Sequence, residues 1–346
     1  MLQVAYAVST SPKEAGEVVP QIYEKGATPM LPQHHHRGKS AQRRHRHSVG
    51  AKGGVKDALQ WYGVSSISEL PSRGARSPKL KSTELPVAHD WRNVDGIRYA
   101  TGSKTQQVPH ICGACWAFAA TGSLSDRVRI AAKGTPIEVD LSPQNLLNCH
   151  TDAGTCLGGN SLAAFESVYN STTGLTDLTC QPYEGVDYSN WGESDCADRM
   201  CLTHDLYGES YWVNGTRVFV DSYGAVDATD LEALMSEVLQ NGPIACYMYA
   251  HSESFEDYTG GIITDATEYP GITHVVALVG WGTDTESGLD YWVVRNSYGT
   301  FWGEQGFYRV QRGINAFNME SGVCEYATPT QESVDALVAA ASLPSL

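Results

Sequence analysis

The chain has 346 residues, 42% hydrophobic and 18% charged, a composition typical of a globular protein that can bury a sizeable core. No run approaches the roughly 18 to 20 consecutive apolar residues of a membrane-spanning helix, so the sequence predicts no membrane span. The formal net charge of −15 disfavours nucleic acid as a partner.

The charge is divided unevenly along the chain. Residues 1–84 carry 13 Lys and Arg against 6 Asp and Glu, whereas residues 85–346 carry 11 against 33. A basic segment before an acidic body predicts two parts that attract each other, or a removable prosegment, and the alternative is a solvated and partly disordered arm. The histidine-rich patch at 34–47 lacks further ligands at a spacing suited to zinc, so no metal or cofactor is expected.

Three helices are predicted in the body. Residues 115–133 have the mostly apolar pattern of one long, buried helix. Ser142-Pro143 predicts the start of a short helix, with serine as N-cap and proline at the first position. Thr229 with Glu232 resembles a capping box, which would open a helix that runs to residue 241.

Strand-like segments dominate after residue 243 and are separated by glycine-rich turns: 244–249, 273–280, 291–295 and 306–312. The sequence therefore predicts an α+β fold for residues 85–330, with a helical half at about 90–205 and a β-rich half at about 206–325. An active site would lie in the cleft between the halves. Residues 331–346 are rich in Ala, Ser and Leu and are expected to form a frayed C-terminal tail.

The cysteines and sequons suggest an oxidising compartment. All nine cysteines follow residue 84, and an odd number suggests four disulfides and one free thiol. Asn170 and Asn214 begin glycosylation sequons. Residues 1–20 show no signal-peptide pattern. A lysosomal, vacuolar or secreted location is expected.

One set of residues suits nucleophilic catalysis. Cys115 lies where a glycine-containing loop enters the long predicted helix, and the positive end of a helix dipole lowers the pKa of a thiol. His274 heads an apolar strand, and Asn296 ends the next strand, so paired strands would bring them together. A thiolate, a base and a group that orients the base together suit amide hydrolysis.

Other interpretations of these residues remain open. Cys112 and Cys115 could form a redox pair, although no βαβ context precedes them. His274 could be an ordinary core histidine. The chain could also be an acyltransferase of the transglutaminase kind, or a catalytically silent homologue that binds peptides.

Five ordered sequence blocks resemble the papain family of cysteine peptidases and cover roughly residues 85–328: Asp90-Trp91-Arg92, Cys112-Gly113-Ala114-Cys115-Trp116-Ala117-Phe118, Cys156-Leu157-Gly158-Gly159, His274 with Gly280-Trp281-Gly282, and Arg295 to Glu304. The resemblance implies a papain-like fold of two subdomains, a helical one with a long central helix and a β-barrel-like one, with Cys115, His274 and Asn296 as catalytic residues.

The resemblance also implies roles for neighbouring residues. Gln106 would donate its amide to the oxyanion, with Gln107 as the fallback. Gly158 and Gly159 would let a substrate backbone approach closely, and Trp302 would floor the primed side of the cleft. The resemblance implies the disulfides Cys112–Cys156 and Cys149–Cys180. Cys196–Cys201 and Cys246–Cys324 are then expected partly by elimination, which leaves Cys115 free.

The seven residues from Gln106 to Cys112 are similar to the cathepsin X (Z) branch, in which this loop is three residues longer than in most of the family. In that branch a loop histidine holds the terminal carboxylate of the substrate, which gives carboxypeptidase action. Here Gln107 stands at that position, and His110 follows three residues on. We therefore expect a carboxypeptidase, with an endopeptidase as the alternative. Tyr298 replaces the usual tryptophan that covers the His–Asn hydrogen bond.

The expected partners are peptide or protein substrates, the protein's own prosegment, and inhibitors of the cystatin type. A monomer is expected.

Overall fold

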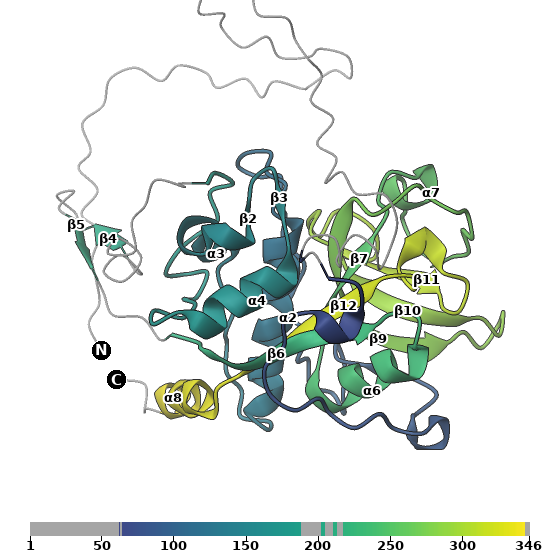
Figure 1. Cartoon of the computed structure of the whole chain (residues 1–346), viewed down its shortest axis with the longest axis horizontal. Coiled ribbons are helices and arrows are strands. Elements are labelled where there is room, and N and C mark those ends of the chain that lie inside the picture. Colours follow the sequence, from purple (N-terminus) through teal and green to yellow (C-terminus); the bar gives the residue numbers. More distant parts are fainter. Residues whose placement is uncertain (1–61, 63, 188–201, 205–209, 213–216, 343–346) are drawn as a thin grey trace, which may run out of the picture. The chain divides into compact units, whose positions relative to one another are not determined.

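The computed structural model describes residues 62, 64–187, 202–204, 210–212 and 217–342, all within one compact unit, Arg46–Leu346 (Figure 1). Cys196, Cys201, Asn214 and residues 1–61 and 63 of the segment expected to be partly disordered lie outside the described residues.

The described helices are α2 (Cys115–Ala131), α3 (Pro143–Cys149), α4 (Ser161–Asn170), α6 (Leu231–Asn241), α7 (Glu253–Glu256) and α8 (Gln331–Ala341), with 3₁₀ turns η1 (Ile67–Glu69), η2 (Ser82–Glu84), η3 (Thr151–Ala153) and η4 (Ala316–Asn318). The predicted start of α3 is confirmed, since the Ser142 side chain accepts a hydrogen bond from the Asn145 amide. The capping box predicted for α6 is wrong. Its N-cap is Asp230, while the Thr229 hydroxyl donates to Asp227 instead.

An eight-stranded, largely antiparallel sheet forms the β-rich half, in the order β6-β12-β7-β9-β10-β11-β8, with β1 added beside β9. Its strands are β1 (His89–Asp90), β6 (Val220–Asp227), β7 (Ile244–Met248), β8 (Ile262–Ile263), β9 (His274–Thr283), β10 (Asp290–Arg295), β11 (Phe307–Gln311) and β12 (Val323–Pro329). Two small ribbons pair β2 (Gly154–Thr155) with β3 (Gly158–Gly159), and β4 (Leu202–His204) with β5 (Ser210–Trp212). The four predicted strand segments are confirmed, but β6 and β12 were not predicted.

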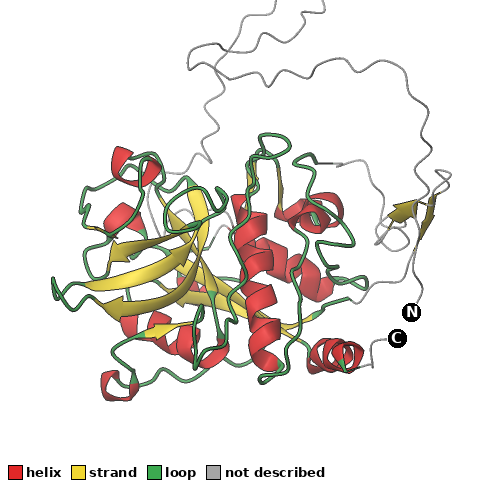
Figure 2. Cartoon of the chain, turned by 180° about the vertical axis from the view of Figure 1, so that it is seen from behind, coloured by secondary structure: helices red, strands yellow, loops and turns green. Residues whose placement is uncertain are grey.

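Helix α2 separates the helical half from the sheet (Figure 2). Every residue from Cys115 to Val128 is buried, because one side of the helix faces α3 and α4 and the other faces β7, β9 and β12. A helix enclosed on all sides needs no amphipathic pattern, which explains the mixed apolar and small residues of this segment. The predicted α+β fold with a long central helix is confirmed.

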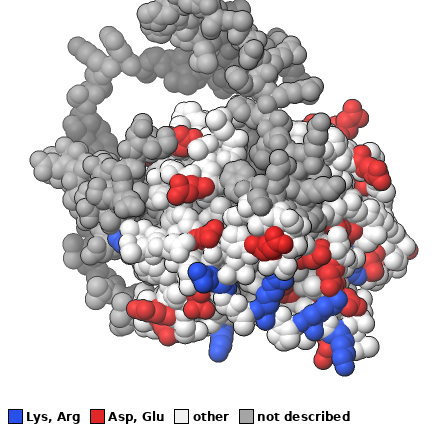
Figure 3. Space-filling model, viewed as in Figure 1, with Lys and Arg blue, Asp and Glu red and all other residues white. Residues whose placement is uncertain are grey.

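Residues 64–84 pack on the body. Arg73 and Tyr223 exchange backbone hydrogen bonds of 2.9 and 3.1 Å, and Leu70 is buried. The Lys79 ammonium lies 2.7 Å from a carboxylate oxygen of Asp230 and 3.3 Å from one of Glu232. Figure 3 shows Lys and Arg side chains gathered at the lower edge of one face, beside Asp and Glu. Lys79 therefore links the described part of the basic segment to acidic residues at the start of α6, and the prosegment role stays a prediction.

The expectation of a frayed tail is wrong for Gln331–Ala341, which form helix α8. The Thr330 side chain caps this helix by accepting from the Ser333 amide. Val334 is buried, and Leu337 and Val338 pack against the core of the helical half. Apolar residues spaced by three and four positions give the helix one face to bury, and this spacing was the missed signal.

Two predicted disulfides are confirmed, Cys112–Cys156 and Cys246–Cys324. The second joins residues that face each other across β7 and β12. Cys149 and Cys180 are each disulfide-bonded, but the pairing predicted among them and the two undescribed cysteines stays a prediction. No helix in the described part of the chain is long and apolar enough to cross a membrane.

Candidate active site

Cys115 is the first residue of α2, and its thiol is the free one among the described cysteines. The backbone amides of Val275, Trp116 and Cys115 itself act on the thiol and lower its pKa, but burial has the larger effect and raises it to about 11. The predicted position at a helix N-terminus is confirmed, whereas the predicted fall in pKa is wrong because desolvation outweighs the amide dipoles. The Val275 contact also puts the thiol beside the residue that follows His274.

His274 and Asn296 meet as predicted. His274 opens β9, Asn296 directly follows β10, and these two strands pair antiparallel. His274 Nε2 lies 2.8 Å from Asn296 Oδ1. Because a carbonyl oxygen only accepts hydrogen bonds, Nε2 carries the proton, and Nδ1 of the neutral ring is left as the base. Burial lowers the pKa of His274 to about 4, so desolvation acts against the charged form of the imidazole as it does against the thiolate.

Aromatic rings cover the His274–Asn296 hydrogen bond. The Tyr298 ring lies 5.2 Å from that of His274 between centroids, so Tyr298 does supply the expected cover. Trp302 packs 5.7 Å from Tyr298 and donates its indole N–H to the Glu256 carbonyl at 3.1 Å. These contacts exclude water from the imidazole and account for the desolvation that lowers its pKa.

Gln106 is buried and fixed from both ends of its amide. Ser297 Oγ donates to Gln106 Oε1 at 2.6 Å, and Gln106 Nε2 donates to the Cys112 carbonyl at 3.0 Å. The amide has two N–H bonds, so one remains for another acceptor. The first residue of a helix also has no intrahelical partner for its amide, so Cys115 N–H is a second potential donor. This arrangement can stabilise an oxyanion next to the thiol.

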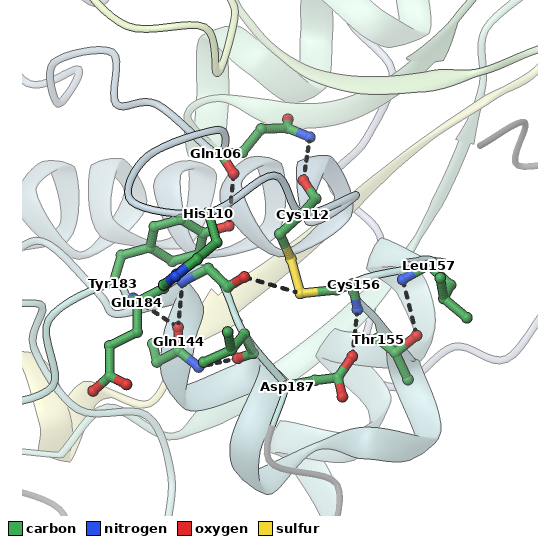
Figure 4. Close-up of a disulfide and its surroundings, with 12 residues drawn as sticks. Gln106, His110, Cys112, Gln144, Thr155, Cys156, Leu157, Tyr183, Glu184 and Asp187 are labelled. Atoms are coloured by element: carbon green, nitrogen blue, oxygen red, sulfur yellow. Dashed lines mark hydrogen bonds between the residues drawn. A yellow bond between two sulfur atoms is a disulfide. The ribbon is translucent and has the colours of Figure 1, made fainter. Parts of the chain in front are cut away.

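The loop between Gln106 and Cys112 is anchored to residues 183–187 (Figure 4). Tyr183 Oη donates to the Gln106 carbonyl at 2.9 Å, and His110 Nδ1 lies 2.9 Å from the Glu184 carbonyl. The disulfide from Cys112 to Cys156 closes the far end. His110 is exposed but its ring points at the Glu184 backbone, so its Nε2 is the atom free to meet a ligand.

Gln107 is exposed at the start of this loop. Its backbone amide bonds the Thr105 hydroxyl at 3.3 Å, while the neighbouring amide of Gln106 bonds the Ser297 carbonyl at 3.0 Å. Gln106 is buried and Gln107 is exposed, which favours Gln106 as the predicted oxyanion donor.

Gly158 and Gly159 form β3 but differ in their surroundings. A Cβ on Gly159 would lie 2.5 Å from a Trp116 ring carbon, so this glycine is required for packing. Gly158 is only partly buried and has φ +128°, a conformation that residues with side chains rarely adopt. The substrate-binding role of both glycines stays a prediction.

Three residues around the site were not predicted to act there: Ser297, Tyr183 and Trp116. Ser297 and Trp116 lie within the sequence blocks quoted above, so their positions were marked although their contacts were not. Tyr183 carries no sequence signal, because its hydrogen bond to Gln106 spans 77 residues.

Among the described residues, no group of three or more His, Cys, Asp or Glu side chains could hold a metal ion. Asn170 is exposed at the end of α4, where a sequon is accessible to modification.

Comparisons with known proteins agree with this geometry. A family profile described as papain family cysteine protease matches residues 85–328. A cathepsin Z of Onchocerca volvulus is 38% identical over 227 residues, which are 66% of this chain and 70% of that protein. A cathepsin L of Sarcophaga peregrina is 33% identical over 252 residues, 69% of this chain and 65% of that one. The structure of procathepsin L 3 from Tenebrio molitor larval midgut matches with a TM-score of 0.56 and 26% identity, over 73% of each chain.

Proposed function

Because the chain belongs to the papain family of cysteine peptidases, we propose that Cys115 is the nucleophile that hydrolyses peptide bonds through a thioester acyl-enzyme. The observation that carries this proposal is the 2.8 Å hydrogen bond from His274 Nε2 to Asn296 Oδ1, which leaves Nδ1 as the base. The Cys115 thiol interacts with the backbone amide of Val275, the residue that follows His274.

The steps follow from these contacts. As Cys115 Sγ attacks the scissile carbonyl carbon, its proton passes to His274 Nδ1, and the oxyanion receives hydrogen bonds from Gln106 Nε2 and the Cys115 amide. His274 then gives the proton to the leaving amine, and a thioester remains. A water molecule loses a proton to His274 and attacks the thioester. The acid product leaves, and the proton returns to the thiol.

For the subtype, we propose a carboxypeptidase that removes residues from the C-terminus of peptides. The anchored loop from Gln107 to Ile111, adjacent to the oxyanion donor, supports this proposal, as does the similarity to a cathepsin Z. The loop is held by a side-chain hydrogen bond and a disulfide. A loop held in this way can close one end of a cleft and present donors to a terminal carboxylate.

His110 and Gln107 are the exposed side chains of this loop that could meet a terminal carboxylate. His110 Nδ1 lies 2.9 Å from the Glu184 carbonyl, which fixes the orientation of the ring. The exposed Gln107 amide would be the second donor.

An endopeptidase is the second candidate. Gln107 is neutral where a charged donor is expected, and His110 is committed to Glu184 through one nitrogen. Without a fixed cation, the loop would tolerate a continuing peptide chain. The 33% identity to a cathepsin L supports this reading.

Matched peptides with free and amidated C-termini, assayed at about pH 5 under reducing conditions, would decide between the two. Cys115→Ala serves as the blank, and His110→Gln tests the loop. Loss of single C-terminal residues from the free acid alone, weakened in His110→Gln, supports the carboxypeptidase. Equal internal cleavage of both peptides supports the endopeptidase. No turnover above the blank, after removal of residues 1–84, would overturn the enzyme proposal.

A further inference from the structure

Two consecutive charged residues of α2 are buried and hold this helix to the β-rich half. Asp126 and Arg127 have exposed fractions of 0% and 2%. Arg127 Nη2 lies 2.8 Å from a Glu237 carboxylate oxygen, and its Nε donates to the Pro243 carbonyl at 2.8 Å. Asp126 instead pairs with Arg295, whose Nη1 lies 2.9 Å from Asp126 Oδ2. The helix thus has two separate ionic attachments.

The Asp126–Arg295 pair also fixes a third segment. The Thr101 amide donates to Asp126 Oδ1 at 2.6 Å. Arg295 Nη1 donates to the Thr101 carbonyl at 3.0 Å and to its hydroxyl at 2.7 Å. Gly122 leaves room for the guanidinium, because a Cβ there would lie 2.6 Å from Arg295 Nη2. These hydrogen bonds join the three residues within the protein interior, where Asp126 Oδ2 and Arg295 Nη2 have no hydrogen-bond partner.

Each of these three segments carries one part of the catalytic site. Asp126 is in the helix that begins at Cys115, and a helix transmits position along its length as a rigid rod. Arg295 directly precedes Asn296. Thr101 lies five residues before Gln106, and the Ser103 hydroxyl between them donates to the Asn296 carbonyl at 2.8 Å.

We propose that Asp126 and Arg295 are positioning residues for catalysis, which set the separation of the Cys115 thiol from the His274–Asn296 pair by locking α2, β10 and residues 101–106 together. This inference rests on the catalytic roles proposed above. A displacement of about 1 Å at a reacting group can cost about 100-fold in rate, so an ion pair far from the substrate can still control kcat.

The alternative is that the pair only stabilises the fold, and Glu237 provides the matched control. The Arg127–Glu237 pair is equally buried and joins the same helix to the same half, but Glu237 lies in α6, which carries none of the proposed catalytic residues. Substitution in either pair should lower stability. Substitution in the Asp126–Arg295 pair alone should change turnover by correctly folded molecules.

The experiment measures KM and kcat for Asp126→Asn, Arg295→Lys and Glu237→Gln, where kcat is the maximum rate divided by the active-site concentration titrated with an irreversible thiol-directed epoxide. We expect Asp126→Asn to lower kcat by about 10- to 100-fold with KM within about threefold of the parent. Arg295→Lys keeps the charge and should retain most of the activity that Asp126→Asn loses. Glu237→Gln should keep the parent kcat.

A kcat for Asp126→Asn within about twofold of the parent, or a fall equal to that of Glu237→Gln, would overturn the inference. Removing one partner of a buried ion pair can prevent folding. If Asp126→Asn gives no folded protein, Thr101→Val decides, since it removes only the hydroxyl acceptor. A threefold or larger fall in kcat supports positioning, and a smaller change refutes it. An inactive parent protein would instead count against the proposed function itself.

Discussion

The burial of Glu325 leads us to predict that the protein loses stability as the pH rises from acidic to neutral. Its side chain is fully buried in β12, where Oε2 accepts a hydrogen bond from Tyr247 Oη at 3.0 Å and contacts Ser161 Oγ, while Oε1 has no partner. Two ionisable groups interact with Glu325. Tyr247 of β7 forms a hydrogen bond with it, and Tyr62 is close enough for the Glu325 charge to raise the pKa of Tyr62. Neither is a cation, so burial raises the Glu325 pKa from 4.5 to about 7.

The magnitude follows from linkage. Below pH 4.5 Glu325 is protonated in both the folded and the unfolded protein, so it does not lower the free energy of unfolding. Between pH 4.5 and about 7 the unfolded chain releases the proton while the folded protein keeps it, so the free energy of unfolding falls as pH rises. Above about pH 7 the loss is complete. A shift of about 2.5 pKa units corresponds to about 3 kcal/mol, a large part of the stability of an ordinary domain.

Urea denaturation of Glu325→Gln, in a Cys115→Ala background that prevents self-digestion, tests this. Between pH 4.5 and 7.5 the background protein should lose about 3 kcal/mol more than the variant, because glutamine keeps the shape and cannot ionise. Glu138→Gln, whose side chain is 92% exposed, is the control and should retain the full pH dependence. Equal pH dependence in Glu325→Gln and its background would refute the reasoning.

Gln106→Ala should lower kcat by about 100- to 1000-fold through loss of an oxyanion donor; steady-state kinetics would check this, and a change in KM alone would contradict it. Gly159→Ala should lower the free energy of unfolding by about 1–3 kcal/mol, because its Cβ would lie 2.5 Å from an indole carbon. Gly102→Ala, with nothing within 4 Å of its Cβ, should leave urea unfolding unchanged. Replacing both Cys246 and Cys324 by alanine should cost about 2–5 kcal/mol in the same assay, since their disulfide spans 78 residues; no change would indicate that this bond does not constrain the unfolded chain.

The catalytic residues could be predicted because their local sequence marks each of them. Cys115 follows a glycine-containing loop and starts a helix, and His274 and Asn296 lie at the ends of recognisable strands. The α+β fold follows from the same patterns. Local patterns do not report the distance between segments, however. The Asp126–Arg295 pair joins residues 169 positions apart, so nothing in the sequence near either residue indicates it.

The same limit explains the wrong predictions. Helix α8 was missed because its composition suggests a flexible tail, while its apolar face is stabilised only by the core that it contacts. The Thr229 capping box failed because Asp230 competes for the same helix start. The pKa of Cys115 was predicted from one helix end, but burial is a property of the whole fold.

Burial has a further consequence for the proposed mechanism. Burial raises the pKa of Cys115 and lowers that of His274, so it disfavours the charged form of each group. A thiolate and an imidazolium formed by proton transfer between them stabilise each other most strongly at close contact. Turnover should therefore depend on the separation of the two segments that carry these groups. This dependence is the physical reason to expect that an ion pair between α2 and β10 affects kcat.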